Sequence, residues 1–314
     1  MNRSTYKVLL LEGIHDIAKE RFEKEGYEVI SLKGALSEQE LIDLIKDIDI
    51  IGIRSKTKIS KKVLDKATHL SIIGCFCIGT DNVDLTAAEQ KKIKVFNSPY
   101  CSSRSVAELI ISEIVLLSRR IGDKNIDMHN GNWNKSAVNS YEIRNKILGI
   151  IGYGHVGSQV SILAEAMGMK VIFYDIESKL PFGNAIACQN LVELLQKANY
   201  ITLHVPETPL TKNLITEKEI NLMLPGSYLL NASRGSVVDL EALAKALTNG
   251  HLAGCAIDVF NNEPLVNCTN WYSILQKCPN TILTPHIGGS TLEAQYAIAN
   301  DIVNKIFNYL ETDF

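Results

Sequence analysis

The stretch Lys146–Met167, KILGIIGYGHVGSQVSILAEAM, decides the fold class of this chain. It begins with an apolar run that lacks polar alternation, which is typical of a strand covered on both faces. Gly152, Gly154 and Gly157 follow in the pattern Gly-x-Gly-x-x-Gly. They open the segment Ser158–Met167, whose apolar residues recur at helical spacing. This order predicts a strand, a tight glycine turn and a helix in an α/β domain.

The residues after this helix predict the ligand of the glycine turn. A second apolar run, Lys170–Tyr174, ends at Asp175, 18 residues after Gly157. In such a turn the glycines permit the bend, let backbone approach a pyrophosphate and let the helix pack on the strand, while the helix N-terminus attracts phosphate charge. Asp175 would accept hydrogen bonds from ribose hydroxyls and repel a 2′-phosphate, even with Lys179 nearby. The sequence therefore predicts NAD rather than NADP as the cofactor.

The same alternation of strand-like and helix-like segments extends over nearly the whole chain. Short runs rich in Val, Ile and Leu alternate with longer amphipathic segments. Apolar runs of this kind predict parallel sheets with helices between the strands, and the runs fall into two sets. We therefore expect two doubly wound α/β domains. The first set is Lys7–Leu11, Glu28–Leu32, Ile48–Ile53, Leu70–Cys75 and Lys94–Asn97; the second is Ile147–Ile151, Lys170–Tyr174, Tyr200–His204, Ser227–Asn231, Gly254–Val259 and Thr281–Leu283.

The gap between the two sets predicts the domain boundary. Ser103–Ile121 has helical spacing, and residues 122–147 follow as a polar stretch. Thr291–Leu310 is again helical in pattern and comes after the last strand. A final helix that returns to the first domain gives a discontinuous domain of residues 1–102 plus 290–314. Residues 103–289 then form the inserted domain, and a cleft is expected between the two.

Composition excludes several classes of protein. With 314 residues, 46% hydrophobic, 21% charged and 20 glycines, the chain fits neither a disordered nor a collagen-like protein. Its net charge of −3, with the signs interspersed, argues against a nucleic-acid partner. No apolar run is long enough to cross a membrane, and charges near the N-terminus argue against a secretory leader, which predicts a cytoplasmic protein.

The seven cysteines include one close pair, Cys75 and Cys77. A zinc site would need further ligands at suitable spacing, which the sequence does not supply. We therefore predict buried thiols in a reducing compartment and no metal site.

Three strand ends carry residues suited to chemistry: Asn231–Gly235 (NASRG), Asp258–Pro264 (DVFNNEP) and Thr284–Gly289 (TPHIGG). Ligands of open α/β sheets lie beyond the carboxyl ends of the strands, so these segments are expected at one edge. Taken singly, a histidine here fits a capped turn, a glutamate fits solvated surface and an arginine fits a surface ion pair. Their shared placement behind a nucleotide fold favours a catalytic set.

That set suits the oxidation of a secondary alcohol. His286 is predicted as the base for the hydroxyl proton and Glu263 as the carboxylate that orients it. Arg234 is predicted as the cation that holds an adjacent carboxylate by a two-point contact or polarises the carbonyl. His204 is a rival base, although no arginine or glutamate motif surrounds it.

In this order, GxGxxG, Asp, ASRG, Glu-Pro and PHIGG resemble the D-isomer-specific 2-hydroxyacid dehydrogenase superfamily. Segments such as LLEGIHDIA, LKGALSEQEL, IGIRSKT, IGCFCIGT, GNWNKSA and FYDIESKLPFGNA resemble its bacterial and fungal phosphoglycerate subgroup, from about Val8 to Leu310. The resemblance implies a Rossmann NAD domain inserted into a flavodoxin-like substrate domain. It also implies a homodimer built on the NAD domain.

The resemblance implies site residues as well. It assigns catalysis to Arg234, Glu263 and His286, and binding of the substrate's phosphate end to Lys33, Arg54, Ser55 and Lys135, with Lys135 reaching across the dimer. It places the following residues around NAD: Gly152, Gly154, His155, Val156, Gly157, Asp175, Ala232, Ser233, Arg234, Asp258, His286, Gly288 and Gly289.

The implied reaction is NAD-dependent oxidation of D-3-phosphoglycerate, the first step of serine synthesis, with 2-oxoglutarate reduction as a side activity. A glyoxylate/hydroxypyruvate or D-lactate type of dehydrogenase is the alternative enzyme, and it would need less positive charge at Lys33, Arg54 and Lys135. A non-catalytic NADH-sensing protein is the alternative from another class. Members of the subgroup usually continue into a serine-binding regulatory domain, whereas this sequence stops at Phe314, so it is either a natural or a truncated short form.

Overall fold

The computed structural model describes residues 5–264 and 267–312, which form two compact units. The first unit comprises Met1–Ser102, Pro264–Thr269 and Ser290–Phe314, and the second comprises Ser103–Glu263 and Asn270–Gly289. Each has its own sheet and its own hydrophobic core.

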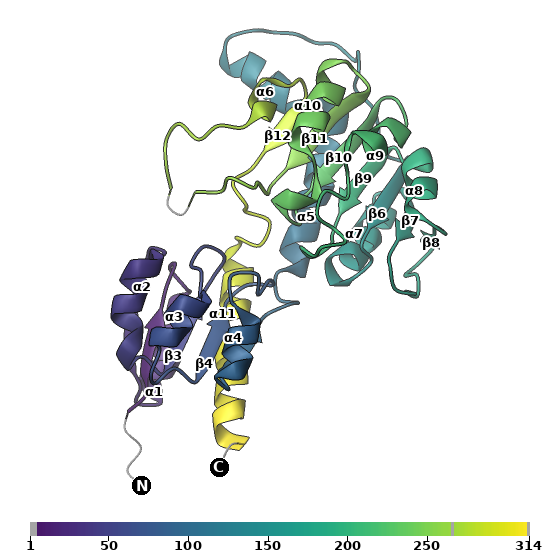
Figure 1. The fold of residues 1–314 in the computed structure, drawn as a ribbon. Coiled ribbons are helices and arrows are strands. Elements are labelled where there is room, and N and C mark those ends of the chain that lie inside the picture. Colours follow the sequence, from purple (N-terminus) through teal and green to yellow (C-terminus); the bar gives the residue numbers. More distant parts are fainter. Residues whose placement is uncertain (1–4, 265–266, 313–314) are drawn as a thin grey trace. The chain divides into compact units, whose positions relative to one another are not determined.

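The first unit contains a sheet of five parallel strands in the order β2-β1-β3-β4-β5 (Figure 1). This is the flavodoxin-like order, in which β1 lies between β2 and β3. Because the strands are parallel, the loops that follow β1, β2 and β3 meet at one edge. The strands are β1 (Lys7–Leu10), β2 (Glu28–Ser31), β3 (Ile50–Ile53), β4 (Ile72–Cys75) and β5 (Lys94–Asn97).

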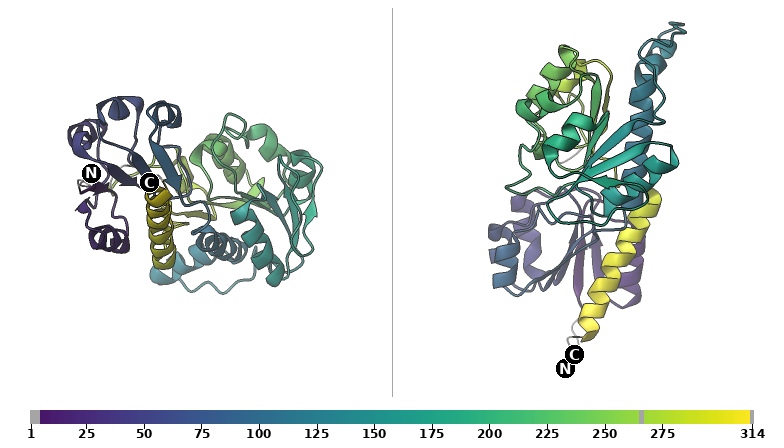
Figure 2. Two further views of the ribbon diagram at one scale, coloured as in Figure 1. Left: turned by 90° about the horizontal axis from the view of Figure 1, so that it is seen from below. Right: turned by 90° about the vertical axis from the view of Figure 1, so that its right-hand side faces the viewer.

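Helices cover both faces of this sheet. Val8 and Leu10 pack under α1 (Asp16–Lys24) and the C-terminal α11 (Leu292–Thr312), which lie side by side although they are far apart in sequence (Figure 2). Leu9 faces the other side, since successive side chains of a strand alternate. That side is covered by α2 (Glu38–Leu44), the 3-10 turn η1 (Ile45–Asp47), α3 (Lys61–Lys66) and α4 (Leu85–Gln90).

The second unit contains seven parallel strands in the order β12-β11-β10-β9-β6-β7-β8. They are β6 (Ile147–Ile151), β7 (Lys170–Tyr174), β8 (Ile186–Ala187), β9 (Tyr200–Leu203), β10 (Ser227–Asn231), β11 (Leu252–Ile257) and β12 (Thr281–Leu283). One face packs against α5 (Ser103–Arg119) and α7 (His155–Ala166). The other packs against α8 (Leu191–Lys197), α9 (Glu217–Leu222) and α10 (Leu240–Thr248), and the 3-10 turns η2 (Gly235–Val237) and η3 (Ile274–Lys277) complete the unit. The predicted α/β class with two parallel sheets is confirmed.

The structure differs from the sequence expectations in three places. The segment expected as a polar stretch from residue 122 begins with a helix, α6 (Ile121–His129), because Arg120 adopts the left-handed region (φ 52°) and starts a new helix after α5. Strand β8 is additional, since two exposed residues make no apolar run. The thiols are less buried than predicted: Cys75 and Cys255 are buried, whereas Cys268 is exposed and the others are half-buried, namely Cys77, Cys101, Cys188 and Cys278.

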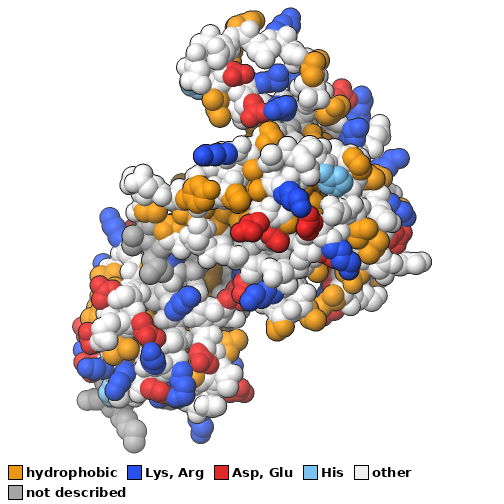
Figure 3. Space-filling view, turned by 45° about the horizontal axis from the view of Figure 1, so that its top comes forward, with side chains coloured by type: hydrophobic (Ala, Val, Ile, Leu, Met, Phe, Trp, Pro, Cys, Tyr) orange, Lys and Arg blue, Asp and Glu red, His pale blue; other side chains and the backbone are white. Residues whose placement is uncertain are grey.

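The surface and the helices bear on the predicted partners. On the face shown in Figure 3, lysine and arginine side chains are interspersed with aspartate and glutamate. Among the described helices, none is both long enough and apolar enough to span a membrane. Within residues 5–264 and 267–312, His, Cys, Asp and Glu side chains form no group of three that is placed to hold a metal ion.

Candidate active site

The carboxyl ends of the strands in the second unit bring the predicted motifs to one edge of its sheet. The glycine turn follows β6, Asp175 follows β7 and His204 follows β9. The remaining three motifs follow β10, β11 and β12 in the same way. Because all seven strands run parallel, all six segments leave the sheet on the same side.

The three motif glycines are required for different reasons. Gly152 has φ +90°, and a Cβ there would lie 2.4 Å from His204 O, while a Cβ on Gly157 would lie 2.2 Å from Gly152 O. These two glycines therefore serve the packing of the chain on itself. A Cβ on Gly154 would meet no protein atom within 4 Å. The space beside Gly154 is the approach that a pyrophosphate needs, at the N-terminus of the 12-residue helix α7.

Asp175 is fixed beside this turn by two main-chain amides. Its Oδ2 accepts from Tyr153 N at 2.7 Å and its Oδ1 from Glu177 N at 2.9 Å. Lys179 pairs with Glu177, and that hydrogen bond raises the pKa of the lysine. The carboxylate of Asp175 is thus oriented by the turn that would hold the pyrophosphate, as recognition of a ribose diol requires. The donors and the open space of this edge fit NAD.

His286 and Glu263 form a hydrogen-bonded pair. His286 Nδ1 lies 2.8 Å from Glu263 Oε2, and the other oxygen, Oε1, accepts from Phe260 N at 3.0 Å. Burial works to raise the pKa of Glu263, but the hydrogen bond and charge of His286, the Phe260 amide and the charge of Arg234 outweigh it. The pKa of Glu263 lies below its ordinary value, so the carboxylate is ionised and can orient the imidazole. His286 itself has φ +55°, a left-handed conformation that is uncommon outside glycine and occurs at functional sites.

Arg234 lies on a loop whose own residues are joined by hydrogen bonds. Its Nη1 donates to Ser233 O at 2.8 Å, and Asn231 Nδ2 donates to Arg234 O at 2.9 Å. Ser233 is buried, and its hydroxyl donates to Asn231 Oδ1 at 2.7 Å. A Cβ on Gly235 would lie 2.4 Å from Phe260 C, so the arginine loop packs directly on the segment that leads to Glu263. The structure therefore brings Arg234, Glu263 and His286 together.

Asp258 holds the histidine loop from beneath. It is 1% exposed; its Oδ1 accepts from Thr284 Oγ1 at 2.5 Å and Ile287 N at 2.8 Å, and its Oδ2 accepts from Gly288 N at 2.8 Å. The sequence predicts Asp258 around NAD; in the structure it is a buried carboxylate that fixes the two residues after His286.

Sequence reasoning missed Glu113 of α5, which is buried near Asp258. Its Oε1 has no hydrogen-bond partner, and burial together with the charge of Asp258 raises the pKa of Glu113 to about 8. No motif marks this residue, because a single glutamate in an apolar helix resembles a surface position in the sequence.

The alternative base, His204, lies against the glycine turn and is not part of the hydrogen-bonded pair of Glu263 and His286. Its Nε2 is 3.0 Å from Thr202 Oγ1, and its main-chain oxygen is the atom that a Cβ on Gly152 would strike. Burial lowers the pKa of His204 to about 3, so its ring is neutral and a weak base.

The residues predicted for the phosphate end are divided between the units. Lys33, Arg54 and Ser55 follow β2 and β3 at the carboxyl edge of the first unit; Lys33 and Ser55 are exposed and Arg54 is half-buried. Glu12 follows β1 between them, and sequence reasoning missed it.

Lys135 belongs to the second unit and lies away from its strand-end edge. Helix α5 extends from the strand-end edge of the sheet to the opposite edge. Near its start, Val106 lies beside Gly288, and near its end the carbonyl of Leu117 accepts from Asn280 Nδ2 at 3.3 Å, just before β12 begins. Helix α6 and the exposed segment with Lys135 therefore continue beyond the amino ends of the strands. Within one chain, the structure does not bring Lys135 to Arg234.

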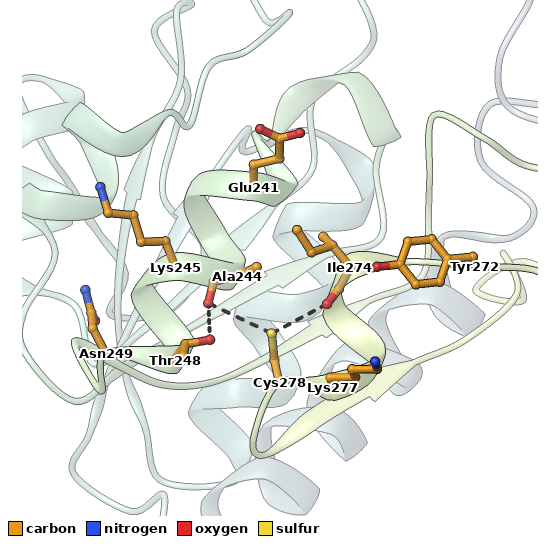
Figure 4. Close-up of a pocket in the computed structure, with 9 residues that line it drawn as sticks. All are labelled: Glu241, Ala244, Lys245, Thr248, Asn249, Tyr272, Ile274, Lys277 and Cys278. Atoms are coloured by element: carbon orange, nitrogen blue, oxygen red, sulfur yellow. Dashed lines mark hydrogen bonds between the residues drawn. The ribbon is translucent and has the colours of Figure 1, made fainter.

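A separate groove of about 570 Å³ lies between α10 and η3 (Figure 4). Cys278 Sγ lies 3.9 Å from Ala244 O and 3.8 Å from Ile274 O, and Thr248 Oγ1 donates to Ala244 O at 2.8 Å, so these groups contact one another within the walls of the groove. None of the predicted site residues lines it.

The chain is similar to known proteins over nearly its whole length. Residues 111–288 match the family model of the D-isomer specific 2-hydroxyacid dehydrogenase NAD binding domain. A D-3-phosphoglycerate dehydrogenase from Dictyostelium discoideum is 56% identical over 306 residues, which are 98% of this chain and 75% of that protein. The enzyme of that name from Escherichia coli (strain K12) is 51% identical over 310 residues, 98% of this chain and 76% of that protein.

Solved structures extend the likeness to the fold. The crystal structure of a D-lactate dehydrogenase from Aquifex aeolicus, complexed with NAD and lactic acid, has a TM-score of 0.85 at 28% identity. It matches 98% of this chain and 96% of that one. From the glycine turn, the Glu263–His286 pair and these matches, we conclude that the chain belongs to the NAD-dependent D-isomer-specific 2-hydroxyacid dehydrogenases.

Proposed function

We propose that this protein oxidises D-3-phosphoglycerate to 3-phosphohydroxypyruvate with NAD, reversibly, as the first step of L-serine synthesis. The observation that carries the reaction type is the 2.8 Å contact between His286 and Glu263, next to Arg234. The substrate is supported by the relatives of that name, which are 51% and 56% identical over nearly the whole chain.

Each catalytic residue has one task in this proposal. NAD, held at the glycine turn from Gly152 to Gly157, would supply the acceptor for the hydride of the substrate. His286 takes the hydroxyl proton, since its Nδ1 faces Glu263 and its Nε2 is left for the substrate. Glu263 keeps the ring oriented and stabilises the imidazolium that forms. Arg234 holds the substrate carboxylate, because its planar guanidinium matches a carboxylate by two parallel hydrogen bonds.

We assign the NAD contacts to the second unit and the phosphate contacts to the first. The glycine turn from Gly152 to Gly157 would hold the pyrophosphate, and Asp175 the adenosine ribose. Lys33, Arg54 and Ser55 would bind the phosphate. Cationic side chains suit a dianion because their attraction sums over a few ångströms without demanding one geometry.

We propose further that the protein is a homodimer. The segment from α6 to Tyr141 exposes large apolar side chains, and Trp133 is 80% exposed. Such a surface is typical of a protein interface. Lys135 lies beyond the amino ends of the strands in its own chain, so it would serve a substrate bound to the partner. Light scattering at micromolar concentration tests this, and a monomer would contradict it.

A side activity follows from the same charges. 2-Oxoglutarate has a 2-oxo acid at one end and a carboxylate at the other, so we propose that the enzyme reduces it to 2-hydroxyglutarate. One negative charge fewer should raise KM more than it lowers kcat, since the contacts at the reacting end are unchanged.

We also propose a cytoplasmic location. All seven cysteines are free, including the exposed Cys268, which fits a reducing compartment.

Steady-state oxidation of NADH with five 2-oxo acids tests the proposed substrate. We expect the highest kcat/KM for 3-phosphohydroxypyruvate, then 2-oxoglutarate, with hydroxypyruvate, glyoxylate and pyruvate lower. A higher kcat/KM for glyoxylate, hydroxypyruvate or pyruvate would assign the enzyme to another member activity of its family. No turnover with any of the five would favour a binding protein.

A further inference from the structure

Glu12 occupies a central place at the carboxyl edge of the first unit. It follows β1, which lies between β2, the strand before Lys33, and β3, the strand before Arg54. It is 9% exposed, and its backbone is in the left-handed region at φ 63°. A buried glutamate in a strained conformation is rare unless the surrounding structure holds it there.

The carboxylate of Glu12 binds the main chain of the loop that carries Arg54. Its Oε1 accepts from Arg54 N at 3.2 Å and from Thr57 N at 2.8 Å, and its Oε2 accepts from Lys56 N at 3.0 Å. Three amides of one loop therefore converge on one side chain. Hydrogen bonds to an ionised acceptor are the stronger kind, so this contact fixes the path of the loop.

The main chain of the same residue binds the loop that carries Lys33. Glu12 N donates to Gly34 O at 3.0 Å, and Gly13 N donates to Leu32 O at 3.1 Å. Residues on both sides of Lys33 are thus tied to Glu12 and its neighbour. The two loops expected to supply positive charge are joined through one residue.

Glu12 fixes the loop without neutralising the arginine. Arg54 Nη1 donates to the main-chain oxygen of Glu12 at 3.4 Å, and within the described residues no ion pair joins Arg54 to the Glu12 carboxylate. The carboxylate oxygens face amides, which leaves the guanidinium charge for a ligand. Cys77 Sγ lies 3.4 Å from Arg54 O and 3.1 Å from Gly79 O, so its single hydrogen is shared between these two carbonyls.

We propose that Glu12 is a positioning residue that sets the preference of the enzyme for substrates with a distal anion. It does so by holding the Arg54 and Lys33 loops in one arrangement. This inference rests on the proposed function, because it takes Arg54 and Lys33 as the cations for that anion. A carboxylate close to an anion site is unfavourable by charge alone, so its retention here is explained by the loop geometry that it imposes.

The test is the selectivity of Glu12→Gln, a change that preserves shape. An amide nitrogen cannot accept a hydrogen bond, so at least one of the three N–H groups loses its partner. We expect the ratio of kcat/KM for 3-phosphohydroxypyruvate to that for glyoxylate to fall about tenfold, mainly through KM for the phosphorylated substrate. Glyoxylate has no distal anion and reports on the reacting end only.

Asp49→Asn is the matched control. Asp49 is half-buried at the opposite edge of the same sheet, and its carboxylate accepts from Lys7 N at 2.8 Å. Its amide variant should lose stability without changing the substrate ratio. If Glu12→Gln is not recovered folded, Glu12→Asp keeps the charge but is one methylene shorter, and the same fall in the ratio is expected there.

Arg54→Ala separates failure of this inference from failure of the proposed function. If Arg54→Ala lowers the ratio while folded Glu12→Gln or Glu12→Asp leaves it unchanged, the inference about Glu12 is overturned. The inference is overturned equally if the Glu12 variants lose activity toward both substrates to the same extent, which would indicate a purely structural role. If Arg54→Ala leaves the ratio unchanged, the proposed substrate site itself is wrong.

Discussion

The two units hold their most important loops with the same device, a carboxylate at the end of one strand that accepts amides from the loop after the neighbouring strand. In the second unit, Asp258 after β11 holds Ile287 and Gly288 after β12. In the first unit, Glu12 after β1 holds Arg54 and Thr57 after β3. A parallel sheet makes this possible, because adjacent strand ends lie about 5 Å apart at one edge.

The two carboxylates differ in their surroundings. Asp258 is 1% exposed and has the buried carboxyl of Glu113 nearby, so the second unit keeps two acidic groups together away from water. Glu12 has the main chain of Arg54 around it instead. Under the proposed function, the device holds the proposed proton-transfer group in the second unit and the proposed anion-binding group in the first. Loss of the Asp258 contacts should therefore change kcat, and loss of the Glu12 contacts should change KM.

The largest effect is expected from removing the group that Asp258 holds in place. His286→Ala should lower kcat by roughly 10²- to 10⁴-fold, the usual contribution of general acid–base catalysis, while NAD still binds. Stopped-flow and steady-state kinetics measure this. His251→Ala is the control, since His251 lies before β11 at the other end of the sheet and its Nε2 bonds Ile220 O at 2.9 Å. Near-normal turnover of His286→Ala would transfer the role to His204 or to water.

The next effect concerns the device itself. Asp258→Asn should lower the free energy of unfolding by about 2–3 kcal/mol, because an amide group cannot accept from all three of its donors. It should also lower kcat, since the histidine loop loses its support. Chemical denaturation and kinetics check both. Asp239→Asn, in which the carboxylate accepts two amides at the start of α10, should be close to neutral in both measurements because asparagine also caps helices.

A smaller effect should appear in the pH dependence of stability. With a folded-state pKa of about 8 against an ordinary value of 4.5, Glu113 keeps its proton in the folded state after the unfolded chain has released it. The contribution of Glu113 to the free energy of unfolding therefore falls as the pH rises from about 4.5 to 8. Relative to Glu113→Gln, the wild type should lose about 2 kcal/mol between pH 6 and pH 8. If the free energy of unfolding of the wild type relative to Glu113→Gln is the same at pH 6 and pH 8, Glu113 is instead ionised throughout.

The smallest effect is expected at Asp175, the carboxylate proposed to bind the ribose of the cofactor. Asp175→Ser should weaken NAD by roughly tenfold, about 1.4 kcal/mol, and improve the use of NADPH. Fluorescence titration with NADH and NADPH measures both affinities. Glu177→Gln is the control, since that exposed carboxylate pairs with Lys179 only two residues away. A wild type that already binds the two cofactors equally would place the ribose elsewhere.

Much of the fold followed from the sequence, because strands buried on both faces leave continuous apolar runs. The runs at Ile147–Ile151 and Ser227–Asn231 were predicted with the bounds that the structure has. The glycine turn, Arg234, Glu263 and His286 could be singled out because each lies within a few residues of the end of such a run. The α6 helix could not, since Gly122, Asp123 and Asn125 give it a polar composition that resembles a loop.

The supporting carboxylates were outside the reach of sequence reasoning. Glu12 follows a strand and precedes a glycine, which is also how a solvated turn looks. Glu113 lies in a helix, and neither its burial nor its proximity to Asp258 can be read from spacing. Both act through contacts between residues distant in the chain. The contacts of the Glu12 carboxylate span 42 to 45 positions, and they can be inferred only once the sheet order is known.

The empty space beside Gly154 makes it possible to distinguish the effect of a substitution on the amount of folded enzyme from its effect on activity. At Gly152 and Gly157 a side chain would strike the protein's own backbone, so substitution there reduces the amount of folded enzyme as well as its activity. At Gly154 a side chain meets no protein atom, so abundance in a cell would be insensitive to small substitutions while growth that depends on the reaction would not be. A library scored for both abundance and growth would therefore reveal the outline of the cofactor as the set of positions where the two scores diverge.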